Sequence, residues 1–104
     1  MTRNLARVVV LLGLALGSGS PAVLPAMWER AKVALDGAYS VSLDETAEAV
    51  RLLAGRARVV AEGAGALALA AAIRNRWDER VVCIVSGGNI DPGKLAQILA
   101  GETP

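Results

Sequence analysis

The polar residues that could take part in chemistry stand at two points of the chain. Ser86, Gly87, Gly88 and Asn89 directly follow an apolar run at 80–85. In open α/β sheets, ligands bind beyond the carboxyl ends of the strands, and paired glycines allow a ligand to approach the backbone closely. This motif therefore fits either a ligand-binding turn or a glycine-rich connection that binds nothing.

Glu62 is the second candidate, because it precedes a segment composed almost entirely of Ala, Gly and Leu. Two interpretations are open for it. The carboxylate either points into a buried crevice or is an ordinary acidic group at a helix N-terminus, where the helix dipole favours negative charge. Cys83 lies between Val82 and Ile84, and we expect it to be an inert core residue.

The composition excludes several kinds of chemistry. The 104 residues include 11 Lys and Arg, 10 Asp and Glu, 1 Cys and no His, for a formal net charge of +1. Histidine-based triads and His-bearing zinc sites are excluded, and there is no basic field for nucleic acid. The lone cysteine favours a reducing, cytoplasmic compartment. Chemistry must then come from carboxylates, a hydroxyl, Lys32, Lys94 or a bound organic cofactor, and we expect no metal site.

The elements that position these residues are predicted from turn and capping signals. Ser42 and Glu45 form a capping box that starts a helix, and Gly55 is its natural end. The run at 80–85 is typical of a parallel strand covered on both faces. The predicted helices are 20–35, 42–54, 63–73 and 91–99, and a further short strand is predicted at 38–42. This order indicates an α/β fold with a partial parallel sheet and packed helices.

The first 16 residues have two interpretations. Arg3 and Arg7 precede an apolar run at 8–16, which is the outline of a secretory signal peptide and would imply export. The run is too short to span a membrane, which takes about 20 apolar residues. The alternative is a buried strand rich in β-branched residues. We leave residues 1–16 as an apolar leader or a strand remnant, and expect no membrane partner.

Three segments together resemble one family. They are Val41-Ser-Leu-Asp-Glu45, Glu62-Gly-Ala-Gly-Ala-Leu-Ala-Leu-Ala-Ala72 and Val82-Cys-Ile-Val-Ser-Gly-Gly-Asn-Ile-Asp91. In this order and spacing they resemble the C-terminal part of a pyridoxal-phosphate (PLP) enzyme of the tryptophan-synthase-β fold type, in the threonine ammonia-lyase (threonine dehydratase) and serine racemase branch. The resemblance covers roughly residues 17–100 and implies that residues 17–104 are the C-terminal portion of a fold-type-II PLP domain.

The resemblance implies dehydration and deamination of threonine or serine, a step of amino-acid metabolism such as isoleucine biosynthesis. Ser86 would bind the pyridine nitrogen of PLP, Gly87, Gly88 and Asn89 would shape the wall, and Glu62 would lie near the ring. Gly19 would line the site through a looser match. A neutral hydroxyl does not hold the ring nitrogen protonated as a carboxylate would, so the ring would be a weaker electron sink.

The chain departs from the family pattern in ways that bear on activity. The family's Schiff-base lysine, its glycine-rich phosphate loop and its cation-binding carboxylates lie upstream of these motifs, and none matches here. Neither Lys32 nor Lys94 has the Ser-x-Lys context. We therefore expect no catalytic residue in this chain and no activity from it alone. The alternatives are a non-catalytic truncated or split-gene fragment that needs an N-terminal partner or self-associates, and a relative of threonine synthase or serine racemase.

Overall fold

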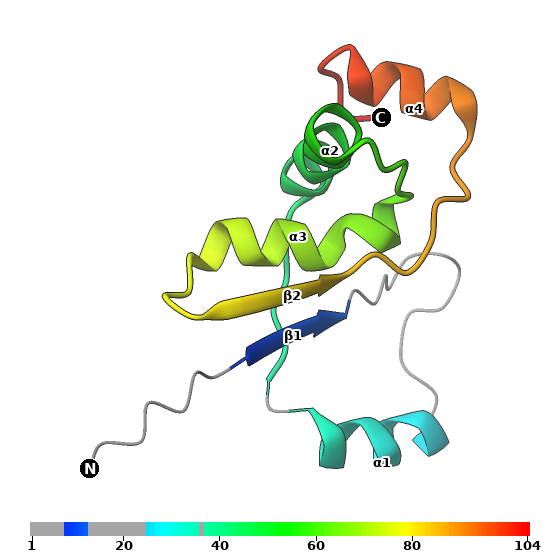
Figure 1. Cartoon of the computed structure of the whole chain (residues 1–104). Helices are drawn as coiled ribbons and strands as arrows, with labels where there is room; N and C mark the ends of the chain where they lie inside the picture. The colour runs from blue at the N-terminus through cyan, green and yellow to red at the C-terminus, as the bar shows by residue number, and fades with distance from the viewer. Residues whose placement is uncertain (1–7, 13–24, 36) are drawn as a thin grey trace.

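A computed structural model gives the fold and describes residues 8–12, 25–35 and 37–104. Figure 1 shows two adjacent strands, β1 (Val8–Leu12) and β2 (Arg80–Ile84), with α3 (Gly63–Asn75), α2 (Leu43–Leu52) and α4 (Pro92–Leu99) on one side of them and α1 (Pro25–Ala34) apart on the other side. A π-helical turn follows α2 at Leu53–Ala57. The combination of parallel strands and packed helices is of the α/β class.

The two strands are parallel although they lie at opposite ends of the chain. Val8 pairs with Arg80 and Leu12 with Ile84. The apolar run near the N-terminus therefore forms a strand over these five residues. Residues 1–7 and 13–16, Gly19 and the predicted helix start at 20–24 lie outside the described residues.

Helix α3 covers one face of β2, and its alanines permit close packing. Val81 and Cys83 point toward α3 and contact Ala68 and Ala71. Burial raises the pKa of the Cys83 thiol above its ordinary value, in keeping with the expected inert core role. A second cluster joins α2, α3 and α4, with buried residues Ala47, Ala49, Val50, Ala61, Ala66, Ala70 and Ile98.

Helix α2 begins as the sequence predicts, but the helical path continues beyond the predicted end through the π-helical turn at Leu53–Ala57. The Glu45 amide donates to Ser42 Oγ at 3.1 Å, and the Ser42 amide donates to Glu45 Oε1 at 2.9 Å. The expected end at Gly55 is wrong, because the chain continues through the π-helical turn. Arg58 ends it in the left-handed region at φ 57°, and the next amide, of Val59, donates to Leu53 O at 2.9 Å.

The predicted strand at 38–42 is also wrong. The structure has no strand between 37 and 42, because the backbone of this segment pairs with neither β1 nor β2, which form a two-stranded sheet with each other. Instead Tyr39 packs edge-to-face on Trp77, with ring centroids 5.1 Å apart, and the Ser40 carbonyl accepts a hydrogen bond from Arg74 Nη1 at 2.7 Å.

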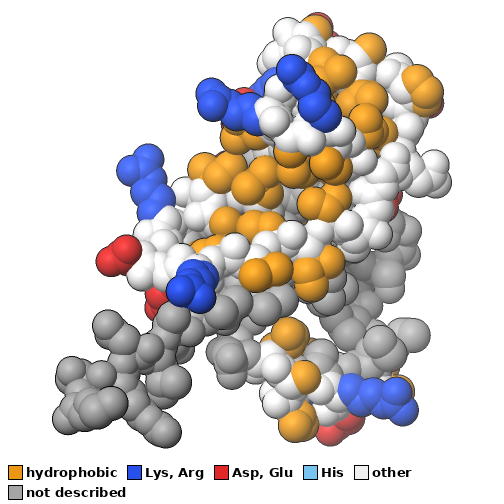
Figure 2. Space-filling model, viewed as in Figure 1, with side chains coloured by type: hydrophobic (Ala, Val, Ile, Leu, Met, Phe, Trp, Pro, Cys, Tyr) orange, Lys and Arg blue, Asp and Glu red, His pale blue; other side chains and the backbone are white. Residues whose placement is uncertain are grey.

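Hydrophobic side chains remain on the surface of this small fold. Figure 2 shows them spread over the helices and the strand edge in one view. Among the described residues, twelve large hydrophobic side chains are at least a third exposed, and the only large side chain that is fully buried is Val50. Within the same residues, no helix is long and apolar enough to cross a membrane.

Candidate functional site

The structure brings together the two motifs that the sequence singled out. The segment after β2 turns across the N-terminal end of α3, and the Glu62 amide donates a hydrogen bond to the Gly87 carbonyl at 3.1 Å. Ser86 precedes this contact and is exposed at the carboxyl end of β2. The hydroxyl of Ser86 thus lies at the sheet edge where α/β folds bind ligands.

Glu62 occupies an unusual position at the start of α3. It is the N-cap residue, but its side chain makes no capping hydrogen bond. Its carboxylate lies instead against Gly87, where a Cβ would overlap Glu62 Oε1 and come within 3.3 Å of its Cδ. Glu62 is partly buried. Its carboxylate therefore packs on the 86–89 segment and makes no capping hydrogen bond to α3.

The two glycines of the motif serve packing inside the protein. A Cβ on Gly88 would come within 2.5 Å of the Val60 carbonyl oxygen, just as a Cβ on Gly87 would meet Glu62. The space that their side chains would fill is thus taken by protein atoms. Their conformation holds the segment close to residues 60–62, which in turn fixes where Ser86 lies.

Gly65 completes this contact and was not predicted as a site residue. A Cβ at position 65 would overlap the Gly87 carbonyl oxygen and lie 3.1 Å from the Gly87 amide nitrogen. The backbone of α3 and the backbone after β2 therefore touch directly. A sequence signal existed, since a glycine inside an alanine-rich helix costs about 1 kcal/mol relative to Ala and usually has a packing reason.

Beyond the glycines, the chain enters α4 through a capped turn. The Ile90 amide donates to the Gly88 carbonyl at 3.0 Å. Asp91 then caps α4, as the sequence predicts, by accepting a hydrogen bond from the Lys94 amide at 3.0 Å. Asn89 is exposed between these two turns, so both ends of the 86–89 segment are held by defined contacts.

The two lysines lie on other elements. Lys32 is on α1 and pairs with Glu29 at 3.0 Å. Lys94 is in the first turn of α4 and is exposed. Among the described residues, no three His, Cys, Asp or Glu side chains lie close enough to hold a metal ion.

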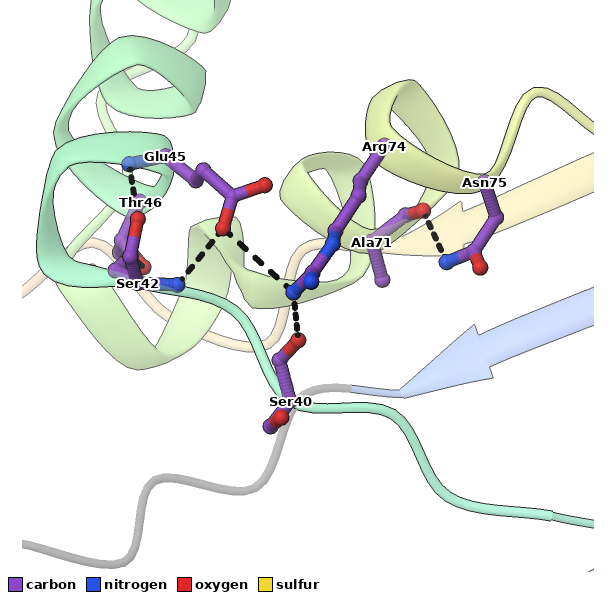
Figure 3. Close-up of polar contacts among 7 residues, drawn as sticks. All are labelled: Ser40, Ser42, Glu45, Thr46, Ala71, Arg74 and Asn75. Atoms are coloured by element: carbon purple, nitrogen blue, oxygen red, sulfur yellow. Dashed lines mark hydrogen bonds and ion pairs between the residues drawn. The ribbon is translucent and has the colours of Figure 1, made fainter.

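A polar network that the sequence did not predict holds residues 40–46 against the end of α3. Figure 3 shows Arg74 between Ser40 and Glu45, with Nη1 3.6 Å from Glu45 Oε1. The hydrogen bonds to the Ser42 amide and hydroxyl, joined by Arg74, lower the pKa of Glu45 below its ordinary value. Only the capping box could be recognised from local spacing, because Arg74 is distant in sequence.

Comparison with known proteins agrees with the family resemblance seen in the sequence. A family model described as pyridoxal-phosphate dependent enzyme matches residues 7–87, a span that includes β1, β2 and the segment up to Gly87. The match therefore begins ahead of residue 17, where the sequence resemblance begins. The cofactor of the matched family is pyridoxal phosphate.

The alignment with each individual relative spans only part of that relative's length. The L-threonine ammonia-lyase of Thermotoga maritima is 39% identical over 75 residues, which are 69% of this chain and 18% of that protein. The L-threonine dehydratase catabolic TdcB of Escherichia coli K12 is 40% identical over 76 residues, which are 68% of this chain and 23% of that protein. The Staphylococcus aureus USA300 protein of the same name is 37% identical over 78 residues, or 69% and 22%.

The chain thus spans about a fifth of the length of the curated relatives that it matches. The family model nevertheless covers most of the chain, including both strands and the contact between Glu62 and Gly87. On this match, the chain belongs to the pyridoxal-phosphate-dependent enzyme family.

Proposed function

We propose that this chain forms one wall of the cofactor site in a PLP-dependent dehydratase of threonine or serine. The observation that carries the proposal is the position of Ser86, exposed at the carboxyl end of β2 and fixed by the contact of Gly87 with Glu62 and Gly65. The chain would supply this wall as the C-terminal portion, from residue 17 to 104, of a larger fold-type-II domain. The substrate preference is supported by the relatives, which are an L-threonine ammonia-lyase and an L-threonine dehydratase.

Ser86 would act on the ring end of the cofactor. The chemistry that PLP supplies when bound is electron withdrawal from the α-carbon of the amino acid, which lets the α-proton leave and a β-hydroxyl follow. The Ser86 hydroxyl would donate a hydrogen bond to the pyridine nitrogen. Because a hydroxyl is neutral, it would leave that nitrogen unprotonated and make the electron withdrawal moderate.

The neighbouring residues would position this hydroxyl and shape the wall. Gly87 and Gly88 keep the segment close to residues 60–62, and Asn89 is exposed beside them. The Glu62 carboxylate lies on the same segment and would face the ring as a second support. Gly19 would line the site by its resemblance alone, because it lies outside the described residues.

This chain fits the ring end of the cofactor and not its other end. Lys32 is engaged with Glu29 on α1, and Lys94 lies on α4 with no Ser-x-Lys context. The lysine that links to the cofactor and the residues that bind its phosphate would therefore have to come from another stretch of polypeptide. We infer that the chain is inactive alone and works with a complementing N-terminal segment in the cytoplasm, where its single cysteine suits a reducing environment.

A chimera tests the proposal. The matched 76-residue stretch of the E. coli dehydratase is replaced by the corresponding stretch of this chain, and the product is assayed for PLP absorbance and for 2-oxo acid release from threonine and serine. We expect activity, and at least a tenfold loss on Ser86→Ala. The exposed Glu79→Ala at the start of β2 serves as the control. A chimera that releases 2-oxo acid equally well with and without the Ser86 hydroxyl would refute the role given to Ser86.

Three alternatives have distinct outcomes in the same experiment. A threonine synthase relative would prefer a phosphorylated substrate, and a serine racemase relative would convert L-serine to D-serine. A non-catalytic truncated or split-gene product would leave the chimera folded and without activity.

A further inference from the structure

Gly65, in the first turn of α3, is buried where the helix backbone meets the segment after β2. A Cβ at position 65 would overlap the Gly87 carbonyl oxygen and lie 3.3 Å from the Gly87 carbonyl carbon. These obstacles are backbone atoms, which cannot rotate aside. A Cβ at Gly87 would instead meet the Glu62 side chain, whose end is free to turn. The contact at position 65 therefore tolerates no side chain unless a backbone segment moves.

The buried side chains of α3 decide which segment would move. Ala66 belongs to the buried cluster that joins α2, α3 and α4, and Ala68 packs against β2. The helix is thus held on two sides by closely packed atoms, which yield little. The 86–89 segment is exposed at every residue except Gly87. A side chain at position 65 would therefore displace this segment and leave α3 in place.

A small displacement of the segment is enough to change what Ser86 can do. Consecutive Cα atoms are about 3.8 Å apart, so Ser86 moves with the Gly87 peptide. A side-chain hydrogen bond of about 2.8 Å no longer exists at about 3.6 Å, and misplacing a group by about 1 Å can lower a reaction rate about 100-fold. Loss of the contact at Gly65 would therefore remove the hydrogen bond assigned to Ser86.

We propose that Gly65 is a positioning residue for the dehydratase reaction. By lacking a side chain, it lets the Gly87 peptide rest on α3 and so sets where the Ser86 hydroxyl meets the cofactor ring. Gly65 acts through the Gly87 peptide and not through contact with the cofactor. The inference rests on the proposed function of Ser86 and adds a residue from a different element.

The first test uses the chimera described above with Gly65→Ala, Ser86→Ala or both. Variants that act independently multiply their effects on the rate, whereas variants that act through one group do not. The control is Gly63→Ala, the same change two residues earlier in α3, where a Cβ would lie 3.9 Å from Thr46 Cγ2 in ordinary contact.

We expect Gly65→Ala and Ser86→Ala each to lower 2-oxo acid release about tenfold, and the double variant to be no slower than Ser86→Ala alone. Gly63→Ala should leave the rate unchanged. The positioning role is overturned if Gly65→Ala is as active as the control. It is also overturned if Ser86→Ala costs as much in the Gly65→Ala background as in the unchanged chimera.

The second test needs no cofactor and uses the full 104-residue chain. The Glu62 amide donates to the Gly87 carbonyl at 3.1 Å, and the Ala66 amide donates to the Glu62 carbonyl within α3 at 3.1 Å. Hydrogen exchange followed by NMR gives the ratio of the two rates, in which any global change of stability cancels. We expect Gly65→Ala to raise the Glu62 rate about tenfold relative to the Ala66 rate, and Gly63→Ala to leave the ratio unchanged. An unchanged ratio in Gly65→Ala would overturn the proposal.

A second variant serves if Gly65→Ala does not fold. Gly88→Ala then replaces it in both tests with the same expected and contrary results, because a Cβ there would press the same segment away from the Val60 carbonyl oxygen.

The two proposals fail in different ways. A large effect of Ser86→Ala, with Gly65→Ala neutral or independent of it, leaves the proposed function standing and removes the role of Gly65. An inactive chimera, or one indifferent to Ser86→Ala, removes the proposed function and the role of Gly65 together, and a raised exchange ratio then describes packing alone.

Discussion

At the scale of single residues, the direct contact between Gly65 and Gly87 fixes the candidate site. The helix backbone and the loop backbone approach so closely that a Cβ at position 65 has no space. A side chain at position 65 could fit only if one segment moved away from the other, and that movement would displace Ser86. The position of the serine hydroxyl thus depends on a residue in another element.

Gly65→Ala should destabilise the chain by about 1–3 kcal/mol, the usual cost of overpacking. Gly55→Ala is the control, because a Cβ there meets nothing within 4 Å and the change should stabilise by about 0.4–1 kcal/mol. Urea unfolding followed by circular dichroism measures both. Equal stability of the two variants would contradict the contact.

The lowered pKa of Glu45 gives a pH dependence. Because its folded-state pKa lies below the unfolded value, Glu45 contributes stability at pH above the unfolded value. That contribution is lost as the pH falls through the folded value. Glu45→Gln should therefore lower the free energy of unfolding at neutral pH and converge with the unchanged chain in acid. Urea titrations across the acidic range test this, and a constant difference at all pH values would count against it.

At the scale of elements, Arg51 joins α2 to the end of α4. Its Nη1 donates to the carbonyls of Ile98 at 2.9 Å and Glu102 at 3.3 Å, and its Nε pairs with Glu48 at 3.0 Å. The guanidinium therefore satisfies carbonyls at a helix C-terminus, where positive charge is also favoured by the dipole. Through α4, this contact holds the far end of the segment that begins at Ser86.

Arg51→Ala should cost about 1.5–3 kcal/mol, the range for hydrogen bonds to a charged group. Arg51→Lys should recover only part of that loss, because a single ammonium lacks the planar fork of the guanidinium. Thermal unfolding measures the loss, and hydrogen exchange in α4 locates it. Unchanged exchange in α4 would show that the contact does not hold the helix.

Elements with local signals could be predicted from the sequence, and those that depend on distant partners could not. A few neighbouring residues are enough to recognise the helix caps at Ser42 and Asp91. The same holds for the apolar run that forms β2. The end at Gly55 was predicted wrongly because a π-helical turn and the left-handed Arg58 took its place. The resemblance implied that Glu62 and residues 86–89 both lie near the cofactor ring, but not that they contact each other. The contacts of Gly65 and Arg74 join residues distant in sequence, so local spacing could not predict them.

At the scale of the whole molecule, the described core is small and is built mostly of alanine. A large side chain fully buried adds about 1.5–3 kcal/mol, and only Val50 meets that condition among the described residues. The chain alone should accordingly be marginally stable.

The isolated chain, supplied with PLP and threonine, should release no 2-oxobutyrate. The reason is that neither Lys32 nor Lys94 lies at the candidate site. Chromatographic detection of the 2-oxo acid measures the result, with the unmodified E. coli dehydratase as the positive control. Product formed by the pure chain would contradict the inferred inactivity.

The parallel pairing of β1 with β2 has a consequence for synthesis. Val8 pairs with Arg80, so β1 leaves the ribosome before β2 and waits for its partner until the residues between the two strands have been made. At about 5–20 residues per second, the delay is roughly 4–14 s. During this time β1 is an unpaired apolar strand, which is the kind of segment that aggregates or is held by chaperones. The translation rate between the two strands should therefore influence how much of this protein reaches the folded state.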